Sequence, residues 1–465
     1  MGLLISSTLR FLRLRSKPTV FLLGFVLLGL TENAEASGWQ IEVVDSLPYI
    51  YAPTVLKLDH QGFFHIAYAS RRDSILRYAH WNGTGWVIEI PDSANIERRR
   101  PSLVLDARDW PHIAYGDKKQ GSLKHTFWDG TQWRVEVVDT GGVGIAAALA
   151  LDRQGFPHIT YSDTIWYRNA LKYVYWDGSS WIKKGVIDSF STSGAPALVL
   201  DSLDRPHVAY RYNPSECLKY ACWDGNQWQR AIVDTSGGNA GIYPNLRLNS
   251  QGKPLISHIA GNVAFGVMLS RWKDSLWNTE MVDWYPRMVT SDWLYLSPKD
   301  SVSVAHTVDE FGVFVTIQTE NGWRRDTVVE PGIMGGASLA VDTANVFHLS
   351  YLTTTRVFHA WKDFSGVNEK GTVSLQSLTF RISPNPFQRE TRVILQEGVM
   401  KKGYCVRIYD TVGRLMRKME IKSQQRGCVV WDGRDEKGRL MSAGVYCVVL
   451  EGGVQRISQP VVLIR

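Results

Sequence analysis

Seven tryptophans recur along this chain at nearly constant spacing, and this period limits the fold more than any other feature. A second series of tryptophans precedes the first by five residues in five cases and gives the unit W-(D/N)-G-x-x-W in four. Self-similarity near 45 residues is typical of propeller blades. We therefore predict an all-β fold, a seven-bladed β-propeller over residues 37–364. The steps are 47, 47, 48, 47, 49 and 46 residues between Trp39, Trp86, Trp133, Trp181, Trp228, Trp277 and Trp323.

The two ends of the repeat array complete one another. Trp361 has no partner five residues later, and Trp39 has no unit before it. We predict that residues 38–45 (GWQIEVVD) form the outer strand of the seventh blade. Such closure removes the unpaired sheet edge at which a ring would otherwise open.

Each repeat is predicted to contain four strands. Residues 101–140 hold four short runs rich in Val, Ile, Tyr, Phe and Trp, separated by turn residues. Asp129-Gly130, Asp177-Gly178 and Asp224-Gly225 suit the tight turn between the third and fourth strands, as does Asn82-Gly83. We expect the tryptophans that flank these turns to pack against the next blade.

Five repeats carry an aspartate followed six residues later by a histidine. The other two repeats lose both members together, with Asn249 and Leu255 in one and Ser297 and Ser303 in the other. Joint loss predicts a structural Asp–His contact rather than a ring of metal ligands, which blade symmetry would hold apart. No metal or other cofactor is expected. The pairs are Asp59 and His65, Asp106 and His112, Asp152 and His158, Asp201 and His207, and Asp342 and His348.

The N-terminus has the layout of a secretory signal peptide. Basic residues up to Lys17 precede an apolar run over residues 20–30 and the small-residue site Ala34-Glu35-Ala36. An uncleaved anchor is the alternative, although the apolar run is shorter than the roughly 20 residues that a spanning helix needs. We expect residues 1–36 to be removed and the protein to be secreted.

Charge and cysteine content narrow the partners. The net charge is +7, but residues from 376 onward hold 16 Lys or Arg against 8 Asp or Glu, so the basicity belongs to the tail. No continuous basic stripe is present, and nucleic acid is not an expected partner. The five cysteines lack C-x-x-C spacing, and Cys405, Cys428 and Cys447 are candidates for one disulfide.

Candidate ligand-binding residues lie near the loops between blades, which vary most in sequence. Aromatic residues and arginines there suit acidic sugars. Two repeats replace the tyrosine that ends the second strand with histidine, and we place these histidines at the border of the site. The alternatives are aromatics that pack within their own loops, solvated arginines, and drift of two worn repeats. The candidates are Tyr49, Tyr51, Arg98, Arg100, Arg211, Tyr243, His258, Trp284, Tyr285, Arg287 and His306.

The hairpin unit has a counterpart in known families. D-G-x-x-W at residues 177–181 resembles a shortened form of the sialidase Asp box, which occupies the same turn, and the tandem units look like those of lectin propellers. The likeness implies a related structural turn. It brings no catalytic residue, because the arginine cluster, the tyrosine with a carboxylate and the acid aspartate of sialidases cannot be assigned by motif.

The last 87 residues carry a more specific resemblance. They look like the type A C-terminal sorting domain of type IX secretion cargo, which is related to the Ig-like domain of hook-capping proteins. That resemblance implies an antiparallel β-sandwich over 379–465 after a linker at 365–378, with the secretion machinery of a Gram-negative bacterium as partner. The matching residues are 383–387 (SPNPF), 408–410 with Gly413 and Arg414, 431–433 (WDG), Gly438 and 442–446 (SAGVY).

Together these patterns predict a secreted or cell-surface binding propeller, monomeric and directed at glycans or at a surface protein. A glycosidase and a purely structural surface component are the alternatives. Three convergent arginines with a carboxylate near the central opening would favour the enzyme, whereas an open aromatic shelf would favour binding.

Overall fold

The computed structural model describes residues 38–46, 53–69, 75–93, 96, 100–117, 119–140, 143–163, 170–189, 194–236, 239–261, 265–285, 287–309, 311–320, 322–329, 335–364, 380–395, 405–410, 414–421, 428–452 and 455–464. The predicted leader (1–36) and linker (365–378) lie outside these ranges. No helix within the ranges is long and apolar enough to span a bilayer.

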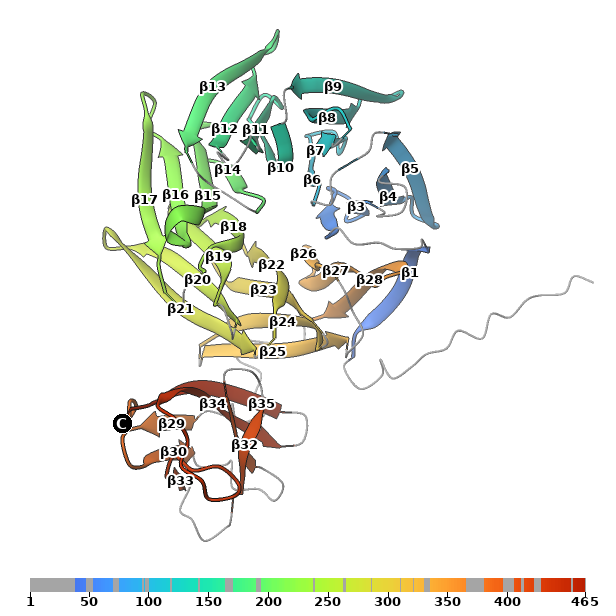
Figure 1. The fold of residues 1–465 in the computed structure, drawn as a ribbon. Coiled ribbons are helices and arrows are strands. Elements are labelled where there is room, and N and C mark those ends of the chain that lie inside the picture. The colour runs from blue at the N-terminus through green and yellow to red at the C-terminus, as the bar shows by residue number, and fades with distance from the viewer. Residues whose placement is uncertain are drawn as a thin grey trace, which may run out of the picture.

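Seven four-stranded antiparallel sheets follow one another through residues 40–363 of the described chain. Figure 1 shows them arranged around a centre, with the first strand of each sheet innermost. The arrangement is consistent with a β-propeller. Sheet 1 holds β2 (Val55–Leu58), β3 (Phe64–Ala69), β4 (Leu76–Trp81) and β5 (Trp86–Asp92); sheet 2 holds β6 (Ser102–Leu105), β7 (Pro111–Asp117), β8 (Ser122–Trp128) and β9 (Trp133–Asp139); sheet 3 holds β10 (Val143–Leu151), β11 (Pro157–Asp163), β12 (Ala170–Trp176) and β13 (Trp181–Asp188).

The remaining four sheets continue in chain order. A short 3-10 helix, η2 (Asn213–Ser215), lies in the connection between the second and third strands of sheet 4. Sheet 4 holds β14 (Ala197–Leu200), β15 (Pro206–Tyr212), β16 (Cys217–Trp223) and β17 (Trp228–Asp234); sheet 5 holds β18 (Ile242–Leu248), β19 (Pro254–Ala260), β20 (Phe265–Lys273) and β21 (Leu276–Tyr285); sheet 6 holds β22 (Val289–Leu296), β23 (Val302–Val308), β24 (Gly312–Thr319) and β25 (Gly322–Val329); sheet 7 holds β26 (Ser338–Val341), β27 (Val346–Leu352), β28 (Arg356–Asp363) and β1 (Gln40–Ser46).

Sheet 7 joins the two ends of the array, as the sequence predicts. β1 pairs antiparallel with β28, with Gln40 opposite Trp361 and Ile41 opposite Ala360. The first strands also contact their neighbours all the way round, from β2 to β6 and onward to β22, β26 and back to β2. The chain therefore forms a closed ring of sheets.

The repeated tryptophans pack on the preceding sheet rather than the next one, which corrects the predicted direction. Trp133 of sheet 2 meets Tyr78 of sheet 1 edge to face at 5.2 Å between ring centroids. Its indole Nε1 donates to Glu89 Oε2 at 2.8 Å on the same sheet. In the five hairpins that have both tryptophans, the first packs instead on the second, as Trp128 does on Trp133 at 5.9 Å. Successive side chains of a strand point to opposite faces of the sheet, and the second tryptophan lies on the face that meets the preceding sheet.

The turn predictions are confirmed. Gly83, Gly130, Gly178 and Gly225 all have positive φ, between 92° and 104°. A Cβ on Gly130 would also lie 2.7 Å from the Trp110 ring, so this turn has no space for a side chain.

The predicted Asp–His contacts are present in four of the five repeats but are long. His65 Nε2 lies 3.5 Å from Asp59 Oδ2, and the contacts in sheets 3, 4 and 7 have the same length. The shorter bonds of Asp59 are made by Oδ1, which accepts from the main-chain N–H groups of Gln61 and Phe63 at 2.9 and 2.7 Å. In sheet 2, His112 Nδ1 instead lies 3.1 Å from His125 Nε2. The aspartate mainly orders the first hairpin of each repeat.

Residues 380–464 form two further antiparallel sheets whose described side chains share one core. β29 (Phe380–Ser383), β30 (Thr391–Leu395) and β33 (Cys428–Trp431) form one sheet. β31 (Cys405–Tyr409), β32 (Leu415–Glu420), β34 (Gly444–Gly452) and β35 (Gln455–Leu463) form the other. Trp431 from the first sheet is fully buried with Val406 and Val448 from the second. Shared burial of this kind is how two sheets of a sandwich associate.

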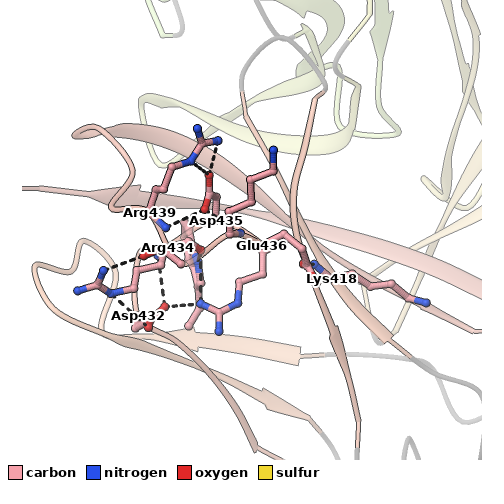
Figure 2. A network of polar contacts seen from close by, with 10 residues as sticks. Lys418, Asp432, Arg434, Asp435, Glu436 and Arg439 are labelled. Carbon is pink, nitrogen blue, oxygen red and sulfur yellow. Dashed lines mark hydrogen bonds and ion pairs between the residues drawn. The ribbon is translucent and has the colours of Figure 1, made fainter.

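Polar contacts order the turn that follows β33, drawn in Figure 2. Arg439 donates to Asp435 through Nε at 2.8 Å and through its main-chain N–H at 2.8 Å. The main-chain N–H of Lys418 donates to Glu436 Oε2 at 2.8 Å, which ties the turn to β32.

All five cysteines lie in the described ranges, and no disulfide joins any two of them. The suggested disulfide among Cys405, Cys428 and Cys447 is therefore wrong for this structure. Cys405 and Cys447 lie on adjacent strands but face Glu451 and Tyr409 respectively in the register, so they are not opposite one another.

Candidate functional site

The first strands of the seven sheets meet at the centre of the ring, and equivalent residues form layers there. Each first strand ends in an x-Leu-x-Leu or closely related run before the turn aspartate or its substitute. Most residues at the two x positions are small or apolar, whereas Lys57, Arg247, Trp293 and Tyr295 are large or charged. The first x position holds Val55, Ser102, Ala148, Ala197, Asn245, Trp293 and Ser338, and the second holds Lys57, Val104, Ala150, Val199, Arg247, Tyr295 and Ala340.

Trp293 of β22 extends to sheets that are not its neighbours. The guanidinium Cζ of Arg100, just before β6, lies 4.7 Å from the centroid of the Trp293 ring. Lys57 Nζ of β2 lies 5.9 Å from the same ring. Trp293 is 6% exposed. Contacts between sheets 6, 1 and 2 cross the centre of the ring. Cations from two separate repeats therefore lie against the same indole.

We call Lys57, Arg100 and Arg247 the central cation cluster. All three side chains are half-buried. Among the residues that the structure describes, none of the three forms an ion pair with a carboxylate. Burial, together with the charges of Arg247 and Arg100, lowers the pKa of Lys57 to about 7. Burial, with the charge of Arg100, lowers the pKa of Arg247 to about 10. The cluster is a concentration of positive charge that is partly shielded from water.

One carboxyl group, that of Asp292, interacts electrostatically with Arg100 of this cluster. Asp292 is fully buried, and the hydroxyl of Ser257 donates to its Oδ2. Its Oδ1 has no hydrogen-bond partner in the described structure. Burial raises the pKa of Asp292 to about 7, although Ser257 and Arg100 act in the opposite direction. Asp292 is therefore only a partial counter-ion for Arg100.

Tyr243, at the start of β18, has a strained backbone. Its φ is +49°, a left-handed conformation that aromatic residues rarely adopt. The side-chain amide of Asn245 donates to the Tyr243 carbonyl at 3.2 Å and to the Asp292 carbonyl at 2.8 Å. Burial lowers the pKa of the Arg100 guanidinium, and the nearby phenol of Tyr243 opposes that lowering. Tyr243 and Arg100 occupy equivalent positions in two repeats. The electrostatic effect of Tyr243 on Arg100 indicates that these two predicted site residues lie near each other.

His258 and His306 hold a different position from the one expected for residues that border a site. Both are completely buried. His258 Nε2 lies 3.3 Å from Asp234 of sheet 4, and His306 Nε2 lies 3.4 Å from Asp283 of sheet 5. Other repeats make the equivalent bond with tyrosine, for example Tyr210 to Asp188. The histidines thus preserve a link between neighbouring sheets.

The remaining described candidates belong to two local arrangements. Tyr285 is 3% exposed and donates to Asp283 at 2.8 Å, while Arg325 donates to the Tyr285 hydroxyl at 3.0 Å. Trp284 is half-buried beside them, and Arg287 is exposed. Arg211 lies in sheet 4, 3.7 Å from Glu216. Tyr49, Tyr51 and Arg98 lie outside the described residues.

Sequence reasoning missed Lys57, Arg247, Asp292 and Trp293. A signal for them was present: the repeat position of Lys57 and Arg247 holds valine or alanine in four other sheets, and that of Trp293 holds small residues in most. A charged or bulky residue at a repeat position that is otherwise small and apolar indicates a role other than packing between the sheets. No group of three or more potential metal ligands occurs among the described residues.

No protein-family model matches the chain, and a search of curated proteins gives no match. Solved structures with a similar fold include AofleA from Arthrobotrys oligospora, at 13% identity and a TM-score of 0.43, covering 62% of this chain and 87% of that one. A variant of the Aleuria aurantia lectin bound to alpha-methyl-L-fucoside has 14% identity and a TM-score of 0.43, covering 62% and 97%. An ulvan lyase, a polysaccharide lyase, has 11% identity and a TM-score of 0.48, covering 68% and 95%.

Proposed function

We propose that this chain is an exported, seven-bladed β-propeller that binds glycans at the centre of its ring and carries a C-terminal Ig-like sorting domain. The observation that supports binding most directly is the stacking of Arg100 on Trp293, 4.7 Å from Cζ to the ring centroid, beside the strained Tyr243. Backbone strain in a non-glycine residue concentrates at functional sites.

This arrangement has the components that a saccharide needs. Aromatic rings offer flat apolar surfaces with polar rims, and a guanidinium offers several fixed donors to hydroxyl or carboxylate oxygens. Tyr243, which is half-buried, supplies the first component, and Arg100, held against the nearly buried Trp293, supplies the second. All three come from first strands or the residues just before them, so the rigid sheets hold them in place.

A glycosidase is the second candidate, and the raised pKa of Asp292 is the observation in its favour. Glycoside hydrolysis generally uses two carboxyl groups that flank the scissile bond. Asp292 is completely buried and is engaged by Ser257. Tyr285 with Asp283 is likewise buried and has one arginine, Arg325, within hydrogen-bond distance. The geometry supports binding better than hydrolysis.

The binding proposal is tested with the purified chain from residue 37 on a broad glycan array. We expect saturable binding that Arg100→Gln and Tyr243→Asn weaken by at least about tenfold, the scale of one lost anchor contact. Asparagine tolerates the left-handed backbone at position 243, so this variant should fold. Arg108→Gln, at an exposed position in the turn between β6 and β7, is the matched control. Binding that survives both site variants would contradict the proposed location, and absence of binding to any glycan would favour a protein partner or a structural role.

The export proposal rests on the SPNPF, WDG and SAGVY segments and has its own test. Phe387 of SPNPF packs against Trp431 of WDG at 5.2 Å between ring centroids with the rings tilted by 56°, and Tyr446 of SAGVY meets Trp431 edge to face at 5.5 Å. Three matching motifs therefore share one core. Deletion of residues 380–465 should leave the protein in the periplasm of a host that has type IX secretion. Unchanged appearance at the cell surface or in the medium would refute the role of this domain.

A further inference from the structure

The central cation cluster is not explained by packing. Two cations stand at a repeat position that is small or apolar in most other sheets, and a third stacks on the tryptophan above them. Removing charge from water is costly unless a counter-charge compensates, and like charges close together add to that cost. Within the described chain, Lys57, Arg100 and Arg247 have no ion-paired carboxylate.

The polar contacts of the cluster leave most of its donors available. Arg247 donates through Nη1 to the carbonyl of Leu246 at 2.8 Å. Lys57 and Arg100 face the indole of Trp293. Asp292, the nearby carboxyl group, is directed to Ser257 and is fully buried. A guanidinium has five donors and an ammonium three, so many remain for an oxygen-rich anion.

We propose that Lys57, Arg100 and Arg247 form an anion-binding site at the centre of the ring, which takes the oxyanion of an acidic saccharide, either a uronate carboxylate or a sulfate ester. Trp293 supports the site by stacking under Arg100 and beside Lys57. This inference rests on the proposed glycan-binding function and specifies its substrate class. It also assigns Lys57 and Arg247 a binding role.

The position of the cluster explains how one anion can meet three cations. Lys57 and Arg247 lie in one layer of the ring, on β2 and β18, and Arg100 lies four residues earlier in the repeat. The Trp293 layer falls between these two levels. An oxyanion with three or four oxygens can accept donors from both levels, as Arg and Lys clusters do when they bind carboxylate or phosphate.

The decisive comparison uses matched ligands. A trimer of galacturonate is titrated by calorimetry beside its methyl ester, which keeps the saccharide and removes the charge, and beside a sulfated neutral trimer. In a fourth arm, thermal unfolding measures the binding of inorganic sulfate, with chloride at equal ionic strength as the reference. We expect the acidic forms to bind at least tenfold more tightly than the ester. Lys57→Gln and Arg247→Gln should abolish that difference.

Matched controls separate this effect from general charge. Lys253→Gln and Lys299→Gln remove exposed lysines in the turns between the first and second strands of sheets 5 and 6 and should leave affinity unchanged. Loss of mutual repulsion means that Lys57→Gln should fold at least as well as the parent chain. Equal affinity for acid and ester would overturn the anion site while leaving glycan binding intact. If inorganic sulfate is the only ligand that binds, and both variants lose that binding, the anion site is supported and its proposed saccharide ligand is refuted.

Discussion

Tyr161 of sheet 3 donates its phenolic hydrogen to Asp139 of sheet 2 at 2.7 Å, and both residues are buried. The same bond joins Tyr68 to Asp45, Tyr115 to Asp92 and Tyr210 to Asp188 at 2.6 to 2.8 Å. In the next two seams His258 and His306 replace the tyrosine and keep the aspartate. A tyrosine or histidine of one sheet thus meets the last aspartate of the sheet before it. This contact fastens neighbouring sheets together.

Tyr161→Phe should therefore destabilise the protein by about 1.5–3 kcal/mol, the usual contribution of a hydrogen bond to a charged group. The substitution removes the hydroxyl and leaves Asp139 with one partner fewer. Urea unfolding measures the change. Tyr175→Phe in the same sheet, where the hydroxyl makes no such link, is the control. Equal losses in the two variants would show that the seam bond contributes nothing.

Removal of residues 38–46 should open the ring. The deletion leaves the edge of β28 unpaired and removes the buried Trp39, whose Nε1 donates to Asp326 at 3.2 Å. Exposed edges associate with other chains, so we expect aggregation and a Tm lower by more than about 10 °C. Light scattering and calorimetry measure both effects. A synthetic peptide of residues 38–46 should restore the Tm, and a truncated chain as stable as the parent would contradict closure by β1.

The buried histidines should contribute less to stability as the pH drops below 6.5. Burial lowers the pKa of His258 to about 4 and that of His112 to about 3, from an ordinary value of 6.5. Since the folded-state pKa is the lower one, the unfolded chain takes up protons first. The stability that these two histidines contribute is complete above pH 6.5 and decreases toward pH 4.

The slope of that decrease tests the contribution of His258. In His258→Gln the pH dependence between 6.5 and 4 should become shallower, as followed by urea unfolding at several pH values. His60→Gln is the control, because the His60 side chain is 74% exposed. An unchanged slope in His258→Gln would mean that this imidazole already titrates normally in the folded protein.

Asp292 should have the opposite pH dependence. Its pKa is raised to about 7 from 3.8, so the folded state holds its proton while the unfolded state has lost it. The stability that this difference supplies is lost as the pH rises from about 4 through 7. Asp292→Asn should therefore stabilise the protein at pH 8 by roughly 1–3 kcal/mol, with the gap closing near pH 4. Asp274→Asn, at an exposed turn, should show no gap at either pH, and a gap independent of pH in Asp292→Asn would contradict the shift.

The direction of tryptophan packing and the partners of the repeated aspartates show where sequence reasoning stops. The spacing of Trp86 and Trp133 predicts that both occupy equivalent places, and they do. It does not predict that Trp133 meets Tyr78 of the preceding sheet, because residue spacing does not tell whether a side chain faces the preceding or the following sheet. The Asp59–His65 contact is likewise foreseen from joint loss of both residues, whereas the stronger turn bonds of Asp59 follow from local backbone geometry.

The sequence by itself determined the repeat, the four strands in each unit, the glycine turns and the closing strand, because each depends on residues within one period or on the two ends of a single series. Only the tertiary structure decided which side chains meet at the centre. Lys57, Arg100, Arg247 and Trp293 come from four different repeats. The contacts of Lys57 and Arg100 with Trp293 exist because closure of the ring brings the inner edges of non-neighbouring sheets together at its centre. Burial of these charges, and the pKa shifts that it causes, arises from that closure as well.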